Sequence, residues 1–288
     1  MARWEAMRVS RTPAFIAGLF GIGALAILAS AAAEAGDITT LKATYAISIA
    51  GITVGRAEAE GRFSGNGYAA AIAGSTSGVT RLVSDATTRL SGNGHILGGA
   101  ILPATYDMST LDNGFATHVS MSMRQGAVSS VVALPELSEA ADRIPVTPAD
   151  KVNVVDPLAA FLIPVDPLGA PSGHSACDRT VKIFDGWTRY DLQLYYKETK
   201  AIDGGRRTYS GIIIVCGARY VPIAGHRPTR KAVQDMANNK RLEVWLAPVA
   251  GAPVLVPFRI LIGTNLGDLI VYATHFTTDS PDHHVMVE

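Results

Sequence analysis

Residues 181–192, Val-Lys-Ile-Phe-Asp-Gly-Trp-Thr-Arg-Tyr-Asp-Leu, decide the fold class. Apolar and polar side chains alternate on both sides of Asp185-Gly186, a dipeptide that tolerates the positive φ angles of tight hairpin turns. A two-residue loop places Phe184 opposite Trp187. The pattern predicts two antiparallel strands that share one apolar face, made of Val181, Ile183, Tyr190, Leu192 and Leu194.

The opposite face of this hairpin mixes aromatic and charged side chains. Phe184, Trp187 and Arg189 are therefore candidates for a contact surface that meets a partner. The alternative, which we favour, is a solvated face with one aromatic cross-strand pair.

The same alternation recurs along the chain. Asn-Gly or Asp-Gly at residues 66–67, 93–94, 113–114 and 203–204 predict further hairpin turns. Period-two apolar runs at 45–49, 119–123 and 242–246 each place one set of side chains on one face of a strand. The predicted fold is mainly β: a curved antiparallel sheet, a half-barrel or open-barrel-like meander, with one or two short helices.

Two segments are helix candidates. Residues 156–162 begin with Asp156 as an N-cap and Pro157 at the first helical position. This segment is short and apolar, so we expect it to plug the concave side of the sheet. Residues 228–239 are a weaker candidate, flanked by the most basic stretch of the chain.

The composition limits the functional classes. The chain has 288 residues, of which 48% are apolar and 17% charged, with 25 basic and 25 acidic side chains. The zero net charge and the lack of a basic stripe argue against a nucleic-acid partner. The apolar content is sufficient for a large core, and residues 36–278 are expected to form one β domain, followed by a polar tail at 279–288.

The N-terminus has the pattern of an export signal. Three arginines at positions 3, 8 and 11 precede an uncharged apolar run from 14 to 33. The run ends in Ala-x-Ala triplets of the kind that signal peptidase cleaves, so residues 1–35 are predicted to be a signal peptide. The alternative is a retained N-terminal anchor, since a run of this length can span a bilayer. Both interpretations place the rest of the chain outside the cytoplasm, in the periplasm.

Cys177 and Cys216 are the only cysteines. In an exported chain, such a pair is expected to form a structural disulfide. If the cysteines lay two strands apart, at about 4.8 Å per strand, their Cα atoms would be too far apart to bridge. We therefore expect Cys177 to lie in the loop before the 181–192 hairpin, folded back over the sheet.

No catalytic, cofactor or metal motif emerges from the sequence. Gly74-Ser-Thr-Ser-Gly78 has Thr76 where a hydrolase nucleophile elbow needs Ser. The seven histidines lack the spacing of a metal site. No catalytic residue, cofactor or metal ligand is therefore predicted.

Several short phrases, taken in order, carry a family resemblance: Gly-Ile-Thr-Val-Gly at 51–55, Asp-Pro-Leu at 156–158, Phe-Asp-Gly at 184–186, Tyr-Val-Pro-Ile-Ala-Gly at 220–225 and Pro-Phe-Arg-Ile at 257–260. With them, the chain resembles the domain of unknown function 3108 (DUF3108), a family of exported bacterial proteins, over roughly residues 41–276. The resemblance implies no activity and no catalytic residue. The pattern is also similar to periplasmic half-barrels that wrap apolar cargo around a helical plug, which is an analogy of fold only.

Three functional hypotheses follow. The leading one is a non-enzymatic binding or scaffolding protein of the cell envelope that holds a lipid, a lipoprotein segment or a partner protein on a concave apolar surface. The alternative is an envelope hydrolase that acts on glycan or lipid through convergent carboxylates, with Asp156, Asp185 and Asp191 as candidates. The third is a structural domain whose sheet edge pairs with another envelope protein.

Overall fold

The computed structural model describes residues 38–78, 85–166, 172–205 and 208–281, all of which belong to one compact unit. The predicted signal peptide lies outside the described residues, as does the tail from residue 282 onward.

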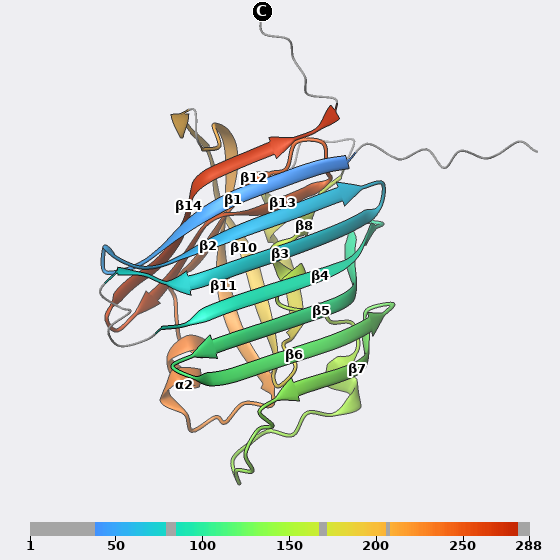
Figure 1. The fold of residues 1–288 in the computed structure, drawn as a ribbon, viewed down its shortest axis with the longest axis vertical. Helices are drawn as coiled ribbons and strands as arrows, with labels where there is room; N and C mark the ends of the chain where they lie inside the picture. Colours follow the sequence, from blue (N-terminus) through green and yellow to red (C-terminus); the bar gives the residue numbers. More distant parts are fainter. Residues whose placement is uncertain (1–37, 79–84, 167–171, 206–207, 282–288) are drawn as a thin grey trace, which may run out of the picture. The chain divides into compact units, whose positions relative to one another are not determined.

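Within the described residues, fourteen strands form one antiparallel sheet, and the predicted fold class is confirmed (Figure 1). The strand order is β7-β6-β5-β4-β3-β2-β1-β14-β13-β12-β11-β10-β9, with β8 paired to β13. The strands are β1 (Ile38–Ile49), β2 (Ile52–Ser64), β3 (Gly67–Thr76), β4 (Thr87–Leu97), β5 (Ala100–Asp112), β6 (Phe115–Arg124), β7 (Ala127–Leu134), β8 (Ile163–Pro164), β9 (Arg179–Phe184), β10 (Arg189–Ile202), β11 (Gly211–Ala224), β12 (Leu242–Pro248), β13 (Val254–Thr264) and β14 (Gly267–Asp279).

The first and last strands meet in the middle of the sheet. β1 pairs with β14 in a register that sets Ala43 beside Phe276. The two edges of the sheet are therefore β7 and β9. A short segment runs between these edges, because the backbone N–H of Val154 donates to Gly126 O at 3.0 Å and that of Val155 donates to Lys182 O at 2.8 Å.

The sheet bends so that its two halves face each other. Figure 1 shows β1–β7 crossing the front, with β10 and β11 running at a steep angle behind them. Three apolar clusters fill the interior, and the segment from Val154 to Ile163 contributes to all three. Ala159 and Leu162 belong to the first cluster, Ile163 to the second and Leu158 to the third. This segment therefore holds the core together, in the position expected for a plug.

The period-two runs in β6 and β12 mark the buried face as predicted, but the run at 45–49 in β1 does not. There the buried positions are Ala46 and Ser48, at 9% and 8% exposed, after a register shift between Thr44 and Tyr45. In β6, Val119, Met121 and Met123 are 0%, 2% and 5% exposed. In β12, Leu242 and Leu246 are likewise buried.

One predicted turn is wrong. Asn93-Gly94 lies inside β4, and the chain reverses at Gly98-Gly99, where both φ angles are positive. A Cβ on Gly94 would lie 2.3 Å from the carbonyl oxygen of Leu102 and 2.9 Å from the ring of Tyr68. This glycine is needed for close packing, and a single sequence does not distinguish that need from a turn.

The 181–192 hairpin forms, but its register differs from the prediction. Phe184 pairs with Arg189, so the loop has four residues, 185–188. The Asp185 carboxylate accepts hydrogen bonds from the backbone N–H groups of Trp187 (2.9 Å) and Thr188 (2.6 Å), and these bonds hold the wider loop. The shift is an even number of residues, so the predicted apolar face is retained.

In the described part of the chain, two short α-helices accompany the sheet, α1 (Gly173–Cys177) and α2 (Lys231–Ala237), and α2 lies within the predicted 228–239 segment. Residues 156–162 form a 3-10 turn, η3 (Ala159–Phe161), instead of an α-helix.

The predicted disulfide is confirmed: Cys177 and Cys216 are bonded, with their Cα atoms 5.4 Å apart. Cys177 lies at the end of α1, which packs on β10 and β11. Among the described residues, no helix has the length and apolar character needed to cross a bilayer.

Candidate functional site

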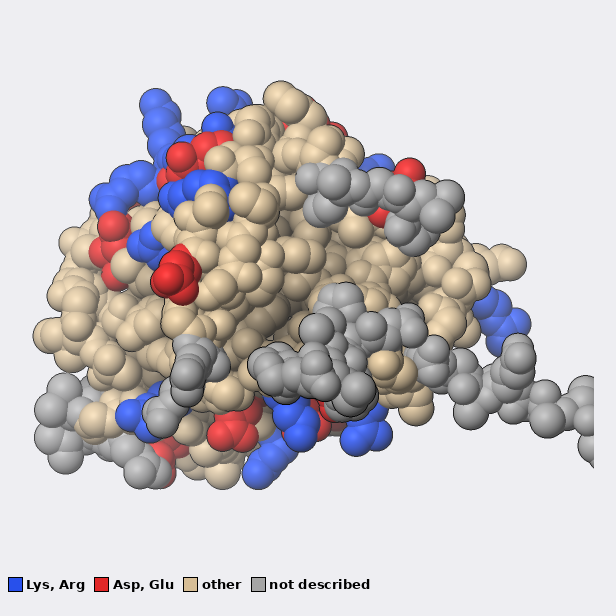
Figure 2. Space-filling model, turned by 90° about the horizontal axis from the view of Figure 1, so that it is seen from above, with Lys and Arg blue, Asp and Glu red and all other residues tan. Residues whose placement is uncertain are grey.

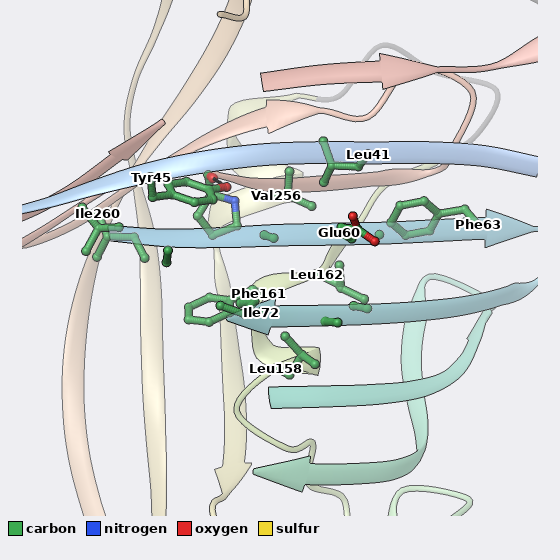
Figure 3. Close-up of a pocket in the computed structure, with 17 residues that line it drawn as sticks. Leu41, Tyr45, Glu60, Phe63, Ile72, Leu158, Phe161, Leu162, Val256 and Ile260 are labelled. Atoms are coloured by element: carbon green, nitrogen blue, oxygen red, sulfur yellow. Dashed lines mark hydrogen bonds between the residues drawn. The ribbon is translucent and has the colours of Figure 1, made fainter. Parts of the chain in front are cut away.

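Two adjoining apolar cavities lie inside the bent sheet. The small cavity, of about 210 Å³, is bounded by β1, β2, β3, η3 and β13, and includes Leu41, Ala59 and Leu162. The large cavity, of about 440 Å³, is bounded by β9–β13 and α2, and includes Leu192, Ala218 and Val244. In Figure 3, the labelled side chains from β1–β3, η3 and β13 converge on the small cavity.

Small inward-facing residues explain why the small cavity is hollow. Neighbouring positions of β2 and β3 carry Gly61 opposite Ala70, and Ala57 opposite Gly74. In the next strand, Gly92 lies opposite Ala70. Larger side chains in this row would fill the space between the sheet and η3, since a Cβ on Gly92 would already lie 3.4 Å from Leu158. The shortage of side-chain volume therefore leaves room that the core does not fill.

Other hollows of the described structure have a different character. The one between β5 and β9 includes Arg179 and Lys182, and the one beside α2 includes Lys240 and Arg241. Viewed from above, the surface is hollowed in an uncharged region, with charged side chains mostly toward its margins (Figure 2).

Asp156 positions the turn that lines the small cavity. Its Oδ1 atom accepts hydrogen bonds from the backbone N–H groups of Leu158 (2.9 Å) and Ala159 (2.8 Å), as the N-cap prediction requires. The side chain is 1% exposed, and Oδ2 accepts no hydrogen bond from the described residues. Burial raises the pKa of Asp156 to about 6 against the opposing effect of the two backbone hydrogen bonds.

Tyrosines surround this carboxyl group. Burial raises the pKa of Tyr68, and the Asp156 charge raises it further. The pKa of Tyr106 is raised by burial and then by the charges of Asp156, Asp185 and Asp107. These phenols stay protonated and neutral, and no lysine, arginine or histidine among the described residues lowers the pKa of Asp156.

Phe161 separates the two cavities. Its side chain borders both of them, together with Pro257, Ile260 and Val271. Although Leu158 and Leu162 on either side of it are 3% and 6% exposed, Phe161 is 37% exposed. Phe161 is therefore far less enclosed than its neighbours and borders two hollow spaces.

The predicted contact surface is buried. Phe184 and Arg189 are 1% and 7% exposed, and Phe184 packs with Tyr106 and Val119 in the core. Trp187 is half-buried, and its indole Nε1 donates to Pro135 O at 3.0 Å. These residues join the hairpin loop to β6 and to the end of β7, so they do not form an exposed surface in this structure. The loop packs against β6 and β7, because a Cβ on Gly186 would lie 2.8 Å from Val119 and 3.4 Å from Ala133.

The candidate carboxylates have structural contacts. Asp185 caps its own loop and also accepts from the Thr188 hydroxyl at 2.7 Å. Asp191 pairs with Arg189 at 2.6 Å. These contacts, together with the capping role of Asp156, give the hydrolase hypothesis no support. In the part of the chain that the structure describes, no group of three or more His, Cys, Asp or Glu side chains could hold a metal ion.

Sequence reasoning did not identify the residues that make the cavities. Ala59, Gly61 and Ala70 look like ordinary small strand residues, and Phe161 looks like a core aromatic. The available signal was the run of Gly and Ala at alternate positions 55–61, which marks an inward face with little volume.

Comparisons with known proteins give a family and a similar fold. The model of a family described as "Protein of unknown function (DUF3108)" matches residues 44–274. No curated protein matches the chain. A crystal structure described as a beta-barrel-like protein of domain of unknown function DUF1849 from Brucella abortus is similar, with a TM-score of 0.50 and 9% identity, over 85% of this chain and 98% of that one. At this identity the likeness shows the fold alone.

Proposed function

Because the chain belongs to the DUF3108 family, whose description assigns no function, we propose a role from the geometry: the protein binds an apolar chain, such as the acyl chain of a lipid or lipoprotein, inside its bent sheet. The observation that carries this proposal is the pair of adjoining apolar cavities that meet at Phe161.

The character of the cavities supports an apolar ligand. A hydrophobic lining with few polar groups is typical of pockets for hydrophobic ligands, and each methylene transferred from water contributes about 0.8 kcal/mol. The charged lining residues are Glu60, on an exposed position of β2, and Glu243, which pairs with Lys197. The tyrosines Tyr190 and Tyr220, whose ring centroids are 5.2 Å apart, line the large cavity with mostly apolar surface.

We place this function in the periplasm. The arginine-flanked apolar run at the N-terminus has the pattern of an export signal. A fully buried disulfide in the core is typical of proteins that mature in an oxidising compartment. The mass of the chain recovered from a periplasmic extract tests both points: loss of about 35 residues together with a mass two protons below the reduced chain is expected. An intact N-terminus in a cytosolic fraction contradicts this placement.

Native mass spectrometry of the protein, purified from cells without detergent, tests the binding proposal. We expect an additional mass that matches a lipid or lipopeptide, and displacement of a fluorescent hydrophobic dye by long-chain fatty alcohols. Val244→Phe introduces a ring into the large cavity and is expected to weaken dye binding at least tenfold.

Val132→Phe is the matched control, because Val132 is 53% exposed on β7. This variant should bind the dye as the unmodified protein does. Absence of both co-purified ligand and saturable dye binding in the unmodified protein contradicts the proposal, as does equal binding by Val244→Phe and Val132→Phe.

A further inference from the structure

We infer that the two cavities are the chambers of one site for a single, uncharged linear alkyl or acyl chain, and that the Phe161 ring is the partition that a long chain displaces. This inference rests on the proposed function and extends it to the form of the ligand.

The first argument is the shared wall. Pro257, Ile260 and Val271 border both chambers, and Phe161 is the one shared residue that comes from neither β13 nor β14. It follows Ala160 at the end of a three-residue turn whose start is fixed by Asp156. Since the backbone of the turn is held at its start, rotation of the Phe161 side chain is the smallest change that joins the chambers.

The second argument is packing. A core aromatic ring is normally enclosed, as Phe184 is at 1% exposure, whereas Phe161 is 37% exposed. A ring with open space on two sides loses few contacts when it rotates. The energetic cost of displacing Phe161 is therefore small compared with that of an enclosed ring such as Phe184.

The third argument is size. Ligand pockets usually enclose roughly 300–1,000 Å³. The small chamber, at about 210 Å³, falls below that range, whereas the large chamber, at about 440 Å³, lies within it. The small chamber is thus better understood as an extension that receives the end of a chain already seated in the large one.

The fourth argument is charge, which selects an uncharged chain. None of the described residues that line either chamber is a lysine, arginine or histidine. Burial raises the pKa of Tyr190 and Tyr220, and the negative charge of Asp185 raises the pKa of both phenols further. An anionic head group inside the site would meet no cation, so it has to remain in solvent or be absent from the ligand.

Saturated fatty alcohols of increasing length are suitable probes, with affinity measured by displacement of a hydrophobic dye and stoichiometry by native mass spectrometry. In the unmodified protein, each added methylene is expected to tighten binding roughly fourfold until the large chamber is filled, after which affinity levels off. In Phe161→Ala, the affinity should continue to rise with each methylene through the chain lengths at which the affinity of the unmodified protein levels off. In Phe161→Trp, the affinity should remain level up to the longest alcohol.

Ala70 tests the small chamber separately, because it lines only that chamber. Ala70→Leu in the Phe161→Ala background should remove the additional gain for long alcohols and leave short alcohols unaffected. Ala69→Leu, at an exposed neighbouring position of β3, should change the affinity for neither long nor short alcohols. We expect one alcohol per protein, and fatty acids that bind more weakly than alcohols of equal length.

Parallel affinity series for the unmodified protein and Phe161→Ala would overturn the partition, as would two alcohols bound at once. Tighter binding of the acids would overturn the uncharged ligand. Each of these results still shows binding, so it leaves the proposed function intact. Failure of every alcohol to displace the dye instead contradicts the proposed function itself.

Discussion

Replacing Asp156 with asparagine tests the electrostatics of the turn that separates the cavities. Asparagine retains an Oδ1 acceptor for the backbone N–H groups of Leu158 and Ala159, and it is as good an N-cap as aspartate. The substitution therefore removes the ionisation while leaving the local hydrogen bonds in place.

The sign of the effect follows from the pKa. Burial raises the pKa of Asp156 from 3.8 to about 6, so the folded protein binds this proton more tightly than the unfolded chain does. The stability of the unmodified protein consequently falls as the pH rises from about 4 to about 6, and this contribution stays constant at higher pH. A shift of about two pKa units corresponds to roughly 3 kcal/mol. Asp156→Asn has no ionisable group at this position and does not lose this stability. Its free energy of unfolding relative to the unmodified protein should therefore rise by that amount between pH 4 and pH 7.

Urea unfolding at a series of pH values, with the disulfide intact, measures this difference. Asp150→Asn is a control of opposite sign, because hydrogen bonds from the hydroxyl and backbone N–H of Thr147 lower the pKa of the exposed Asp150. The stabilisation by ionised Asp150 is fully present above its unfolded pKa of about 4 and is lost as the pH falls below it, so the asparagine variant should lose relative stability as the pH rises toward about 4 and stay level at higher pH. A difference curve for Asp156→Asn that is flat, or that slopes like the one for Asp150→Asn, would refute the assignment of Asp156 as a buried, poorly compensated carboxyl group.

Three further predictions concern stability. Replacing both Cys177 and Cys216 with alanine should lower the free energy of unfolding by about 4 kcal/mol in the chain-entropy model, given the separation of 39 residues, and a reductant should lower the melting temperature of the unmodified protein alone. Gly94→Ala should destabilise the fold by about 1–3 kcal/mol in a denaturant titration because its Cβ meets backbone atoms of β5, whereas Gly74→Ala, with contacts no closer than 3.6 Å, should be nearly neutral. Val119→Ala should cost about 2 kcal/mol because Val119 is fully buried, and an equal effect of the exposed Val132→Ala would contradict the assignment of the core to that face of β6.

The hairpins could be predicted because their signals are local. Alternation within β6 and β12 identifies the buried faces, and Asn113-Gly114 identifies the β5–β6 turn, where both φ angles are positive. The turn predicted at Asn93-Gly94 is wrong for the opposite reason. Gly94 is required because Leu102 and Tyr68 approach it closely from neighbouring strands. A dipeptide indicates which backbone angles are allowed at that point, but it does not indicate which residues of other strands pack against it.

Only part of the candidate site was predictable. The Asp156-Pro157 start of the central turn was identified from its capping residues, and the disulfide from the isolated pair of cysteines in a chain with an export signal. The cavities were not predictable, because a hollow is a difference between the volume that the sheet encloses and the volume that its side chains occupy. Ala59 and Ala70 border a hollow only because the sheet bends far enough to bring β13 opposite them.

By itself, the amino-acid sequence determined the class of structure, the inward faces of strands such as β6 and β12, and the cross-link, because each depends on residue type and short spacing. Tertiary structure alone decided that β1 pairs with β14, that residues 152–155 run between the two sheet edges, and that Phe161 stands between two empty spaces. These features depend on how twist accumulates over fourteen strands and on which distant segments then meet, and no local pattern of residues encodes that sum.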